Sequence, residues 1–208
     1  MTHSPRKQRN AMVTRLRRRG VGDERVLEAM ARVPREKFIP GRLAGNAYED
    51  EPLSIGSGQT ISAPDIVAMM ATALRLSGQE RVLEVGGGNG YAAAVLAECA
   101  ERVVTIERHA ELAARAHRVL TDLGYDNVEV RNADGMLGAS DRAPFDAITV
   151  AAMADEIPDA LTEQLAPDGI LVCPVGDDFG GDLVVLRHGV RERLSPVRFV
   201  PLVSGVEG

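Results

Sequence analysis

The feature that most constrains the fold is an apolar run at residues 82–91 that contains an acid and continues into a series of glycines. The segment has the sequence Val-Leu-Glu-Val-Gly-Gly-Gly-Asn-Gly-Tyr. This pattern predicts a buried strand, a tight turn and a helix, because glycine accepts positive φ and lets a ligand approach the backbone. The N–H groups at the start of that helix would face the ligand. A glycine run alone does not distinguish such a site from an ordinary turn.

A second apolar run makes the prediction more specific. Residues 103–106 have the sequence Val-Val-Thr-Ile and are followed by Glu107. Glu107 lies 21 positions after Gly86. An acid that ends the second strand of a βαβ unit is placed to accept hydrogen bonds from a ribose diol. The two segments together predict a nucleotide-type binding site.

Strand-length apolar runs alternate with helical segments through the rest of the chain. Strands are predicted at 81–85, 102–107, 127–132, 145–150 and 169–175, and helices at 91–100, 109–123 and 156–166. The alternation predicts an α/β fold with a mostly parallel sheet and helices on both faces. Two further strands, Leu183–His188 and Arg193–Leu202 with Gly189 between them, are expected to add an antiparallel edge and make a seven-stranded sheet.

The first part of the chain is expected to form a helical cap. Gly20 and Pro34 indicate the ends of two short helices at 8–19 and 23–32. Residues 34–61 contain seven Pro or Gly residues and no sustained periodicity, which predicts a long ordered loop packed over a site.

A third helix is predicted to follow that loop and to end near Leu76. Ser62 is expected to be its N-cap, with Pro64 in the first turn and Asp65 near the positive end of the helix. A helix start of this kind presents N–H groups to an anion, so a cap and a functional contact are compatible at Ser62.

Composition predicts a soluble cytoplasmic protein. A chain of 208 residues with 45% hydrophobic content can bury the core of one domain. No stretch approaches the roughly 20 apolar residues of a membrane span, and no signal segment is evident. The two cysteines, Cys99 and Cys173, lie inside apolar runs, which indicates neither a disulfide nor a zinc site.

The charge distribution argues against general nucleic-acid binding. The formal net charge is −6, although residues 6–25 hold eight Lys or Arg residues against Asp23 and Glu24. We interpret this basic stretch as a solvated helix face. The four histidines are scattered, and His109 and His117 are interpreted as surface or packing residues. A hydrolase triad is therefore not indicated.

The glycine spacing favours one ligand class over another. Gly86, Gly88 and Gly90 have the Gly-x-Gly-x-Gly spacing that resembles S-adenosylmethionine methyltransferases, whereas dinucleotide enzymes use Gly-x-Gly-x-x-Gly. Asp134 follows the third predicted strand, where that strand should reach the same edge of the sheet, and in methyltransferases of this type that position contacts the adenine amino group. An Asp-Gly turn at Asp134 and Gly135 is the alternative.

Three more segments narrow the resemblance to one family. They are Val-Pro-Arg-Glu-Lys-Phe-Ile-Pro at 33–40, Ala-Tyr-Glu-Asp-Glu-Pro-Leu-Ser-Ile-Gly at 47–56 and Gly-Gln-Thr-Ile-Ser-Ala-Pro at 58–64. With the segments at 82–91, 145–148, 157–158, 165–169 and 198–202, they resemble protein-L-isoaspartate O-methyltransferases in order and spacing. The resemblance implies a single Rossmann-like methyltransferase domain over 1–208, with a helical cap and substrate loop at 1–77 and a cofactor-binding core at 78–208.

The resemblance also implies an activity. Members of this family transfer a methyl group from S-adenosyl-L-methionine to the carboxylate of an L-isoaspartyl residue in a damaged protein or peptide, leaving S-adenosyl-L-homocysteine. The ester then collapses to a succinimide, whose hydrolysis returns some normal aspartate. A carboxylate with a pKa of about 4 is already an ionised nucleophile at neutral pH, so no general base is expected. The implied protein is a metal-free cytoplasmic monomer that binds neither membranes nor nucleic acid.

The resemblance implies a set of site residues. Ser62 corresponds to the family's active-site serine. The implied cofactor-binding residues are Thr60, Ile61, Ser62, Glu84, Gly86, Gly87, Gly88, Gly90, Glu107, Arg108, Ala133, Asp134 and Gly135. The implied substrate-binding residues are Ile55, Gly56, Gln59, Thr60, Val200 and Leu202. Gly87 and Asn89 depart from the hydroxyl residues common in the family, so hydroxyl contacts to the cofactor are expected to be missing there.

Two other functions remain open. A related methyltransferase acting on tRNA or on an aspartate of a biosynthetic peptide has the basic N-terminal stretch as its only support. Readers of nucleobases usually present aromatic side chains, and this chain has no Trp, four Phe and three Tyr. A non-catalytic module that binds S-adenosylmethionine is suggested by the altered glycine turn.

Overall fold

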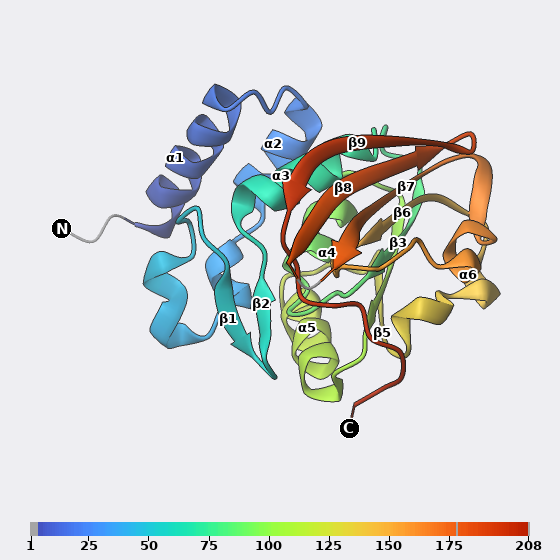
Figure 1. Cartoon of the computed structure of the whole chain (residues 1–208). Coiled ribbons are helices and arrows are strands. Elements are labelled where there is room, and N and C mark those ends of the chain that lie inside the picture. Colours follow the sequence, from blue (N-terminus) through green and yellow to red (C-terminus); the bar gives the residue numbers. More distant parts are fainter. Residues whose placement is uncertain (1–3, 178, 208) are drawn as a thin grey trace.

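The computed structural model describes residues 4–177 and 179–207 (Figure 1). Seven strands form one sheet in the order β5-β4-β3-β6-β7-β8-β9. Their bounds are β3 (Arg81–Val85), β4 (Arg102–Glu107), β5 (Val128–Asn132), β6 (Phe145–Val150), β7 (Leu165–Asp177), β8 (Gly180–Arg187) and β9 (Val190–Val197). Neighbours from β5 to β7 are parallel, and β8 and β9 pair antiparallel. The predicted parallel sheet with an antiparallel edge is confirmed.

Alternate residues of the central strands enter two separate cores, one on each face of the sheet. Val82 and Val103 belong to the first core, whereas Leu83 and Val104 belong to the second. The first face is covered by α3 (Pro64–Ala73), α4 (Tyr91–Ala97) and α5 (Ala110–Asp122). The second is covered by α6 (Asp159–Thr162) and by Ala139 and Ala143, which lie beside the 3₁₀ turns η3 (Gly135–Leu137) and η4 (Ser140–Arg142). This two-sided burial explains why the strands are continuous apolar runs.

The N-terminal cap packs against the helices of the first face. It contains α1 (Pro5–Arg18) and α2 (Glu24–Arg32), which contact α3 and, for α2, α4. Asp23 caps α2, because its Oδ1 accepts a hydrogen bond from the Val26 N–H at 3.2 Å. Figure 1 shows both helices and the β1–β2 hairpin on one side of the sheet. The predicted cap is confirmed.

The segment 34–61 is more regular than predicted. It contains the 3₁₀ turns η1 (Arg35–Phe38) and η2 (Gly41–Asn46), followed by an antiparallel hairpin of β1 (Leu53–Gly56) and β2 (Gln59–Ile61). The prediction of an irregular loop was wrong because both strands are too short to give a detectable alternation. Ile55 and Ile61 are nevertheless buried, so the expected packing of this segment is present.

The predicted N-cap at Ser62 is also wrong. Pro64 takes the first helical position of α3 and Ala63 the N-cap, with φ −55° and ψ 150° and no side-chain cap hydrogen bond. The residue before a proline is held in an extended conformation, which moves the helix start to Pro64. The Ser62 hydroxyl therefore has no capping role.

The bounds of the last four elements differ from the prediction, and β8 and β9 each begin three residues earlier, at Gly180 and Val190 instead of Leu183 and Arg193. The helix expected at 156–166 is only α6, because the chain has already entered β7 at Leu165, which pairs with Phe145. The strand expected at 169–175 is correspondingly longer. β9 ends at Val197 instead of Leu202, and Pro201 beyond it forms only an isolated bridge with Met153.

Neither a membrane span nor a metal site is found in the part of the chain that the structure describes. No helix there is both long and apolar enough to cross a membrane. No group of three or more His, Cys, Asp or Glu side chains in the same residues is arranged to hold a metal ion.

Candidate active site

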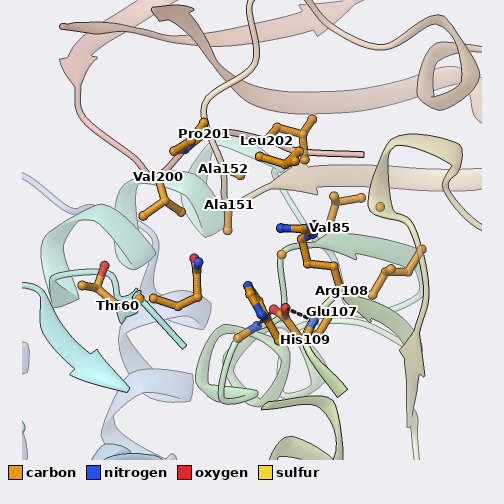
Figure 2. Close-up of a pocket in the computed structure, with 17 residues that line it drawn as sticks. Thr60, Val85, Glu107, Arg108, His109, Ala151, Ala152, Val200, Pro201 and Leu202 are labelled. Atoms are coloured by element: carbon orange, nitrogen blue, oxygen red, sulfur yellow. Dashed lines mark hydrogen bonds between the residues drawn. The ribbon is translucent and has the colours of Figure 1, made fainter. Parts of the chain in front are cut away.

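A cavity of about 220 Å³ lies where the strand order reverses, between β3 and β6. In open α/β sheets, ligands bind in the crevice at the carboxyl ends of the strands at this point. The walls come from the ends of three strands and from a late segment of the chain, as Figure 2 shows. They include Val85 and Gly86 at the end of β3, residues 107–109 at the end of β4, residues 151–152 after β6 and residues 200–203, and the β1–β2 hairpin adds residues 58–60.

The glycine turn is attached to the neighbouring strand by its backbone. The N–H groups of Gly86 and Gly87 donate to the carbonyl of Ile106 at 2.9 and 3.0 Å. Gly86 has φ +84° and Gly88 φ +53°. Residues with a Cβ disfavour these positive values. A Cβ on Gly87 would collide with the Thr105 hydroxyl, which explains why a hydroxyl residue is missing at position 87.

Glu107 fixes the geometry between this turn and the start of α5. Its Oε2 accepts the Gly88 N–H at 2.7 Å, and its Oε1 accepts the His109 N–H at 2.8 Å. The residue is 5% exposed and lines the cavity. Each carboxylate oxygen can accept more than one hydrogen bond, so both remain able to receive a ligand hydroxyl.

A row of buried polar side chains crosses the sheet beside the cavity. Glu84 is in register with Thr105 on β4 and with Thr149 on β6. The Thr105 hydroxyl donates to Glu84 Oε2 at 2.6 Å, and the Thr149 hydroxyl is buried without a partner in the described chain. Burial raises the pKa of Glu84 to about 8, the Thr105 hydrogen bond opposes this, and the charge of Glu107 adds to it. A cationic ligand group could pair with the Glu84 carboxylate and donate a hydrogen bond to the Thr149 hydroxyl.

Val203 lines the opposite end of the cavity, and residues 204–207 continue beyond it. Asp134 Oδ2 accepts the Gly205 N–H at 2.7 Å, and its Oδ1 accepts the Met136 N–H at 2.9 Å. Arg108 lines the cavity and pairs with Glu207 at 2.9 Å. Asp134 thus fixes residues 203–207 beside this end of the cavity.

A second cavity, of about 380 Å³, opens beside the first. It is lined by Pro52, Thr60, Ser62, Ala63, Ile66, Ala151, Arg198, Phe199 and Val200. Thr60, Ala151 and Val200 line both cavities. Ser62 also lines two smaller cavities that reach Glu84. The two larger spaces therefore meet beside the end of the β1–β2 hairpin.

Comparison with known proteins agrees with this geometry. A protein-family model described as protein-L-isoaspartate(D-aspartate) O-methyltransferase matches residues 7–207. The chain belongs to this family.

Relatives within the family resemble the chain over nearly its whole length. Protein-L-isoaspartate O-methyltransferase 1 of Syntrophobacter fumaroxidans is 52% identical, with 97% of this chain and 98% of the relative covered. Protein-L-isoaspartate O-methyltransferase 2 of Marinobacter nauticus is 54% identical, with 96% and 94% covered. A Plasmodium falciparum chain assigned to the family by its description, solved with S-adenosyl-L-homocysteine, has a TM-score of 0.80 at 28% identity, with 94% and 98% covered.

The structure brings most of the family-implied residues to these cavities. Gly86, Gly88, Glu107, Arg108, Gly135, Gln59, Thr60, Val200 and Leu202 line the first cavity, and Ile55, Ile61, Ser62, Glu84 and Gly87 line the smaller ones. Gly56, Ala133 and Asp134 line none of these cavities. Gly90 also lies outside them, and packing accounts for it, since a Cβ there would lie 3.1 Å from the Ala116 Cβ.

Sequence reasoning did not assign several residues that line the first cavity, among them Ala151 and His109. Ala151 lines all four of the spaces around the site, but a small apolar residue gives no signal in the sequence. His109 was interpreted as a surface or packing residue. It is buried at the N-cap of α5, with Nδ1 3.0 Å from Glu207, whereas His117 is exposed. Its position could have been inferred only from its place directly after the strand end at Glu107.

Proposed function

We propose that this protein transfers the methyl group of S-adenosyl-L-methionine to the carboxylate of L-isoaspartyl residues in damaged proteins and peptides. The products are S-adenosyl-L-homocysteine and a methyl ester that collapses to a succinimide. The observation that carries the proposal is the meeting of two cavities at Thr60, Ala151 and Val200, one at the switch point of the sheet and one lined by Ser62. Membership of the family supports the same reaction.

The residues present fit the three parts of the cofactor. Glu84, beside the orphan hydroxyl of Thr149, would bind the ammonium group, because a buried carboxyl needs a cationic partner to ionise. Glu107 would accept hydrogen bonds from the ribose diol. Gly135 would lie against the adenine with Arg108 beside it, and Asp134 would hold the turn that carries Gly135. When bound, the cofactor supplies a methyl group made electrophilic by the sulfonium.

The protein's own contribution is alignment. An isoaspartyl carboxylate with a pKa of about 4 is ionised at neutral pH, so no residue needs to remove a proton. Holding two reactants in a productive geometry can lower a barrier by roughly 7–11 kcal/mol. Ser62 would hold the carboxylate in the second cavity, next to its junction with the first, while Ile55, Gln59, Val200 and Leu202 would shield the reacting groups from water.

A paired-peptide assay tests this function. Two peptides that differ only in an isoaspartyl or aspartyl linkage are incubated with cofactor, and methyl ester formation and methanol release are measured. Turnover of the isoaspartyl peptide alone is expected. Cofactor binding without ester formation would indicate a binding module, and turnover only on tRNA would indicate a different acceptor.

The domain organisation, oligomeric state and location of the protein are also proposals. We infer a monomer in which residues 1–77 form the cap and substrate wall and residues 78–208 the cofactor-binding core. The net charge of −6 supports the absence of a nucleic-acid partner, and the free, buried Cys99 and Cys173 support a reducing cytoplasm. Light scattering should give a mass of 22.2 kDa, whereas twice that mass would contradict the monomer.

A further inference from the structure

Arg35 in η1 is fully buried and lies outside the residues that line the cavities. Burying a guanidinium is unfavourable unless its N–H groups find acceptors. The partners of this side chain therefore indicate which parts of the molecule it holds together.

The guanidinium contacts three segments that are far apart in sequence. Its Nε donates to the carbonyl of Ala47 at 2.7 Å, and its Nη2 donates to the carbonyl of Ser62 at 2.7 Å. Its Cζ lies 4.6 Å from the centroid of the Tyr91 ring, a distance typical of a cation–π contact. One planar group thus binds the main chain at Ser62 and packs on the first residue of α4.

The other end of η1 binds the glycine turn. The carbonyl of Phe38 accepts a hydrogen bond from Asn89 Nδ2 at 2.7 Å. The Phe38 ring packs edge-on against Tyr91, with centroids 5.8 Å apart. Ser62, Asn89 and Tyr91 line the same small cavity. The separation of its two walls therefore depends on η1.

We propose that Arg35 is a positioning residue for methyl transfer, which fixes Ser62 relative to the glycine turn by bonding the Ser62 carbonyl while it packs on Tyr91. This inference rests on the proposed function of the site. Displacement of reacting groups by about 1 Å can lower a rate about 100-fold. Lysine cannot replace the guanidinium, because a single ammonium on a flexible stem does not donate in two fixed directions and pack as a plane.

Arg35→Lys tests the inference. The expected result is a fall in kcat on the isoaspartyl peptide of about ten- to 100-fold. The Kd for S-adenosyl-L-homocysteine should change less than about three-fold, because the residues proposed to bind its adenosine lie at the ends of β4 and β5. Turnover is expressed per cofactor-binding site, so unfolded protein does not enter the rate.

Arg15→Lys is the matched control. Arg15 is a partly buried arginine that donates to the carbonyl of Tyr48 at 2.6 Å and pairs with Asp50, and neither Ser62 nor Tyr91 is among its hydrogen-bond or ion-pair partners. Its replacement should lower the melting temperature but leave kcat within about two-fold. Equal losses of kcat in the Arg35 and Arg15 variants would overturn the inference.

A double mutant separates positioning from general support of the fold. In a Ser62→Ala background, Arg35→Lys should cost less than about two-fold in kcat, because the hydroxyl it positions is already gone. Fully additive losses would contradict the inference. If Arg35→Lys does not fold, Tyr91→Leu removes the ring beneath the guanidinium and should give a smaller fall in kcat with the same coupling to Ser62.

Hydrogen exchange gives a readout that does not depend on turnover. Arg35→Lys should speed amide exchange at residues 61–63 relative to residues 82–85, whereas unchanged exchange would overturn the inference. Failure of the wild-type protein to methylate the isoaspartyl peptide would refute the proposed function, and the exchange experiment would still decide whether Arg35 holds Ser62.

Discussion

Ser62 lies ahead of the N-cap of α3, so its hydroxyl does not stabilise the helix. Ser62→Ala should therefore change the free energy of unfolding by less than about 0.5 kcal/mol. The same change should lower kcat on an isoaspartyl peptide about ten-fold or more, because a group that orients the carboxylate is lost. Chemical denaturation and steady-state turnover measure the two effects.

Asp23 provides the opposite control for Ser62, because it caps α2 far from the cavities. Asp23→Ala should lower the free energy of unfolding by about 1 kcal/mol and leave kcat unchanged. A Ser62→Ala protein with full turnover and a stability loss as large as that of Asp23→Ala would exclude the role proposed for Ser62.

The buried carboxyl of Glu84 predicts a pH dependence of stability. Its pKa is raised from 4.5 to about 8, chiefly by burial. Between these values the folded protein holds a proton that the unfolded chain releases, so the free energy of unfolding should fall as pH rises. Denaturation of the wild type at pH 6 and pH 8.5 should show this fall.

Glu84→Gln is the control for the Glu84 carboxyl, since the amide is neutral in both states and fills nearly the same volume. Its free energy of unfolding should decline less between the two pH values than that of the wild type. Saturating S-adenosyl-L-homocysteine should reduce the wild-type decline, because its ammonium would stabilise the ionised carboxylate. Identical pH profiles for wild type and variant would show that Glu84 ionises normally.

Residues whose position follows from spacing could be predicted, and residues brought in by long-range packing could not. Glu107 and Gly86 lie at the ends of adjacent parallel strands, so their distance in sequence sets their distance in space. Ala151 follows β6. This strand comes after β5 in the chain but pairs with β3 in the sheet, and the sequence does not show that crossover. Arg35 reaches Ser62 through a turn that has no regular pattern.

Among the elements, the central strands were predicted to their end residues and the short peripheral ones were not. β3, β4 and β6 are buried on both faces, so each is an uninterrupted apolar run with clear ends. The β1–β2 hairpin has strands of four and three residues, with Ser57 and Gly58 at positive φ. A hairpin this short depends on the packing of Ile55 and Ile61, which the sequence does not specify.

We expect residues 203–207 to slow the release of the cofactor product. They are held by hydrogen bonds of Gly205 to Asp134 and of Glu207 to the backbone of Arg108 and Ala110, together with the ion pair of Glu207 with Arg108. A chain that stops after Val203 should release S-adenosyl-L-homocysteine about ten times faster, because a loop that closes a site sets the rate of release. Stopped-flow displacement measures this rate.

Glu207→Gln keeps the backbone hydrogen bonds of that segment and removes its ion pair with Arg108. Its release rate should lie between those of the wild type and the shortened chain, and the difference from wild type should shrink at high salt. Release from the shortened chain at the wild-type rate would show that residues 204–207 do not retain the cofactor.

At the scale of the whole molecule, the cap and the sheet share one core. Met12 and Leu16 of α1 belong to the same buried cluster as Val82 and Val172 of the sheet. The cavities are likewise built from both parts, since Thr60 and Glu107 line the same space. We therefore expect residues 1–77 and 78–208 to unfold together in a single transition.

Cofactor binding should stabilise this whole unit. S-adenosyl-L-homocysteine at 100 times its Kd should add about 2.7 kcal/mol to the free energy of unfolding. For a chain of this length, that corresponds to a rise in Tm of about 5–10 °C. Calorimetry should show one transition that moves as a whole, whereas 5′-methylthioadenosine, which lacks the ammonium proposed to meet Glu84, should give a smaller shift. Two transitions, of which the ligand moves only one, would show that cap and core are separate folding units and that the cofactor does not bridge them.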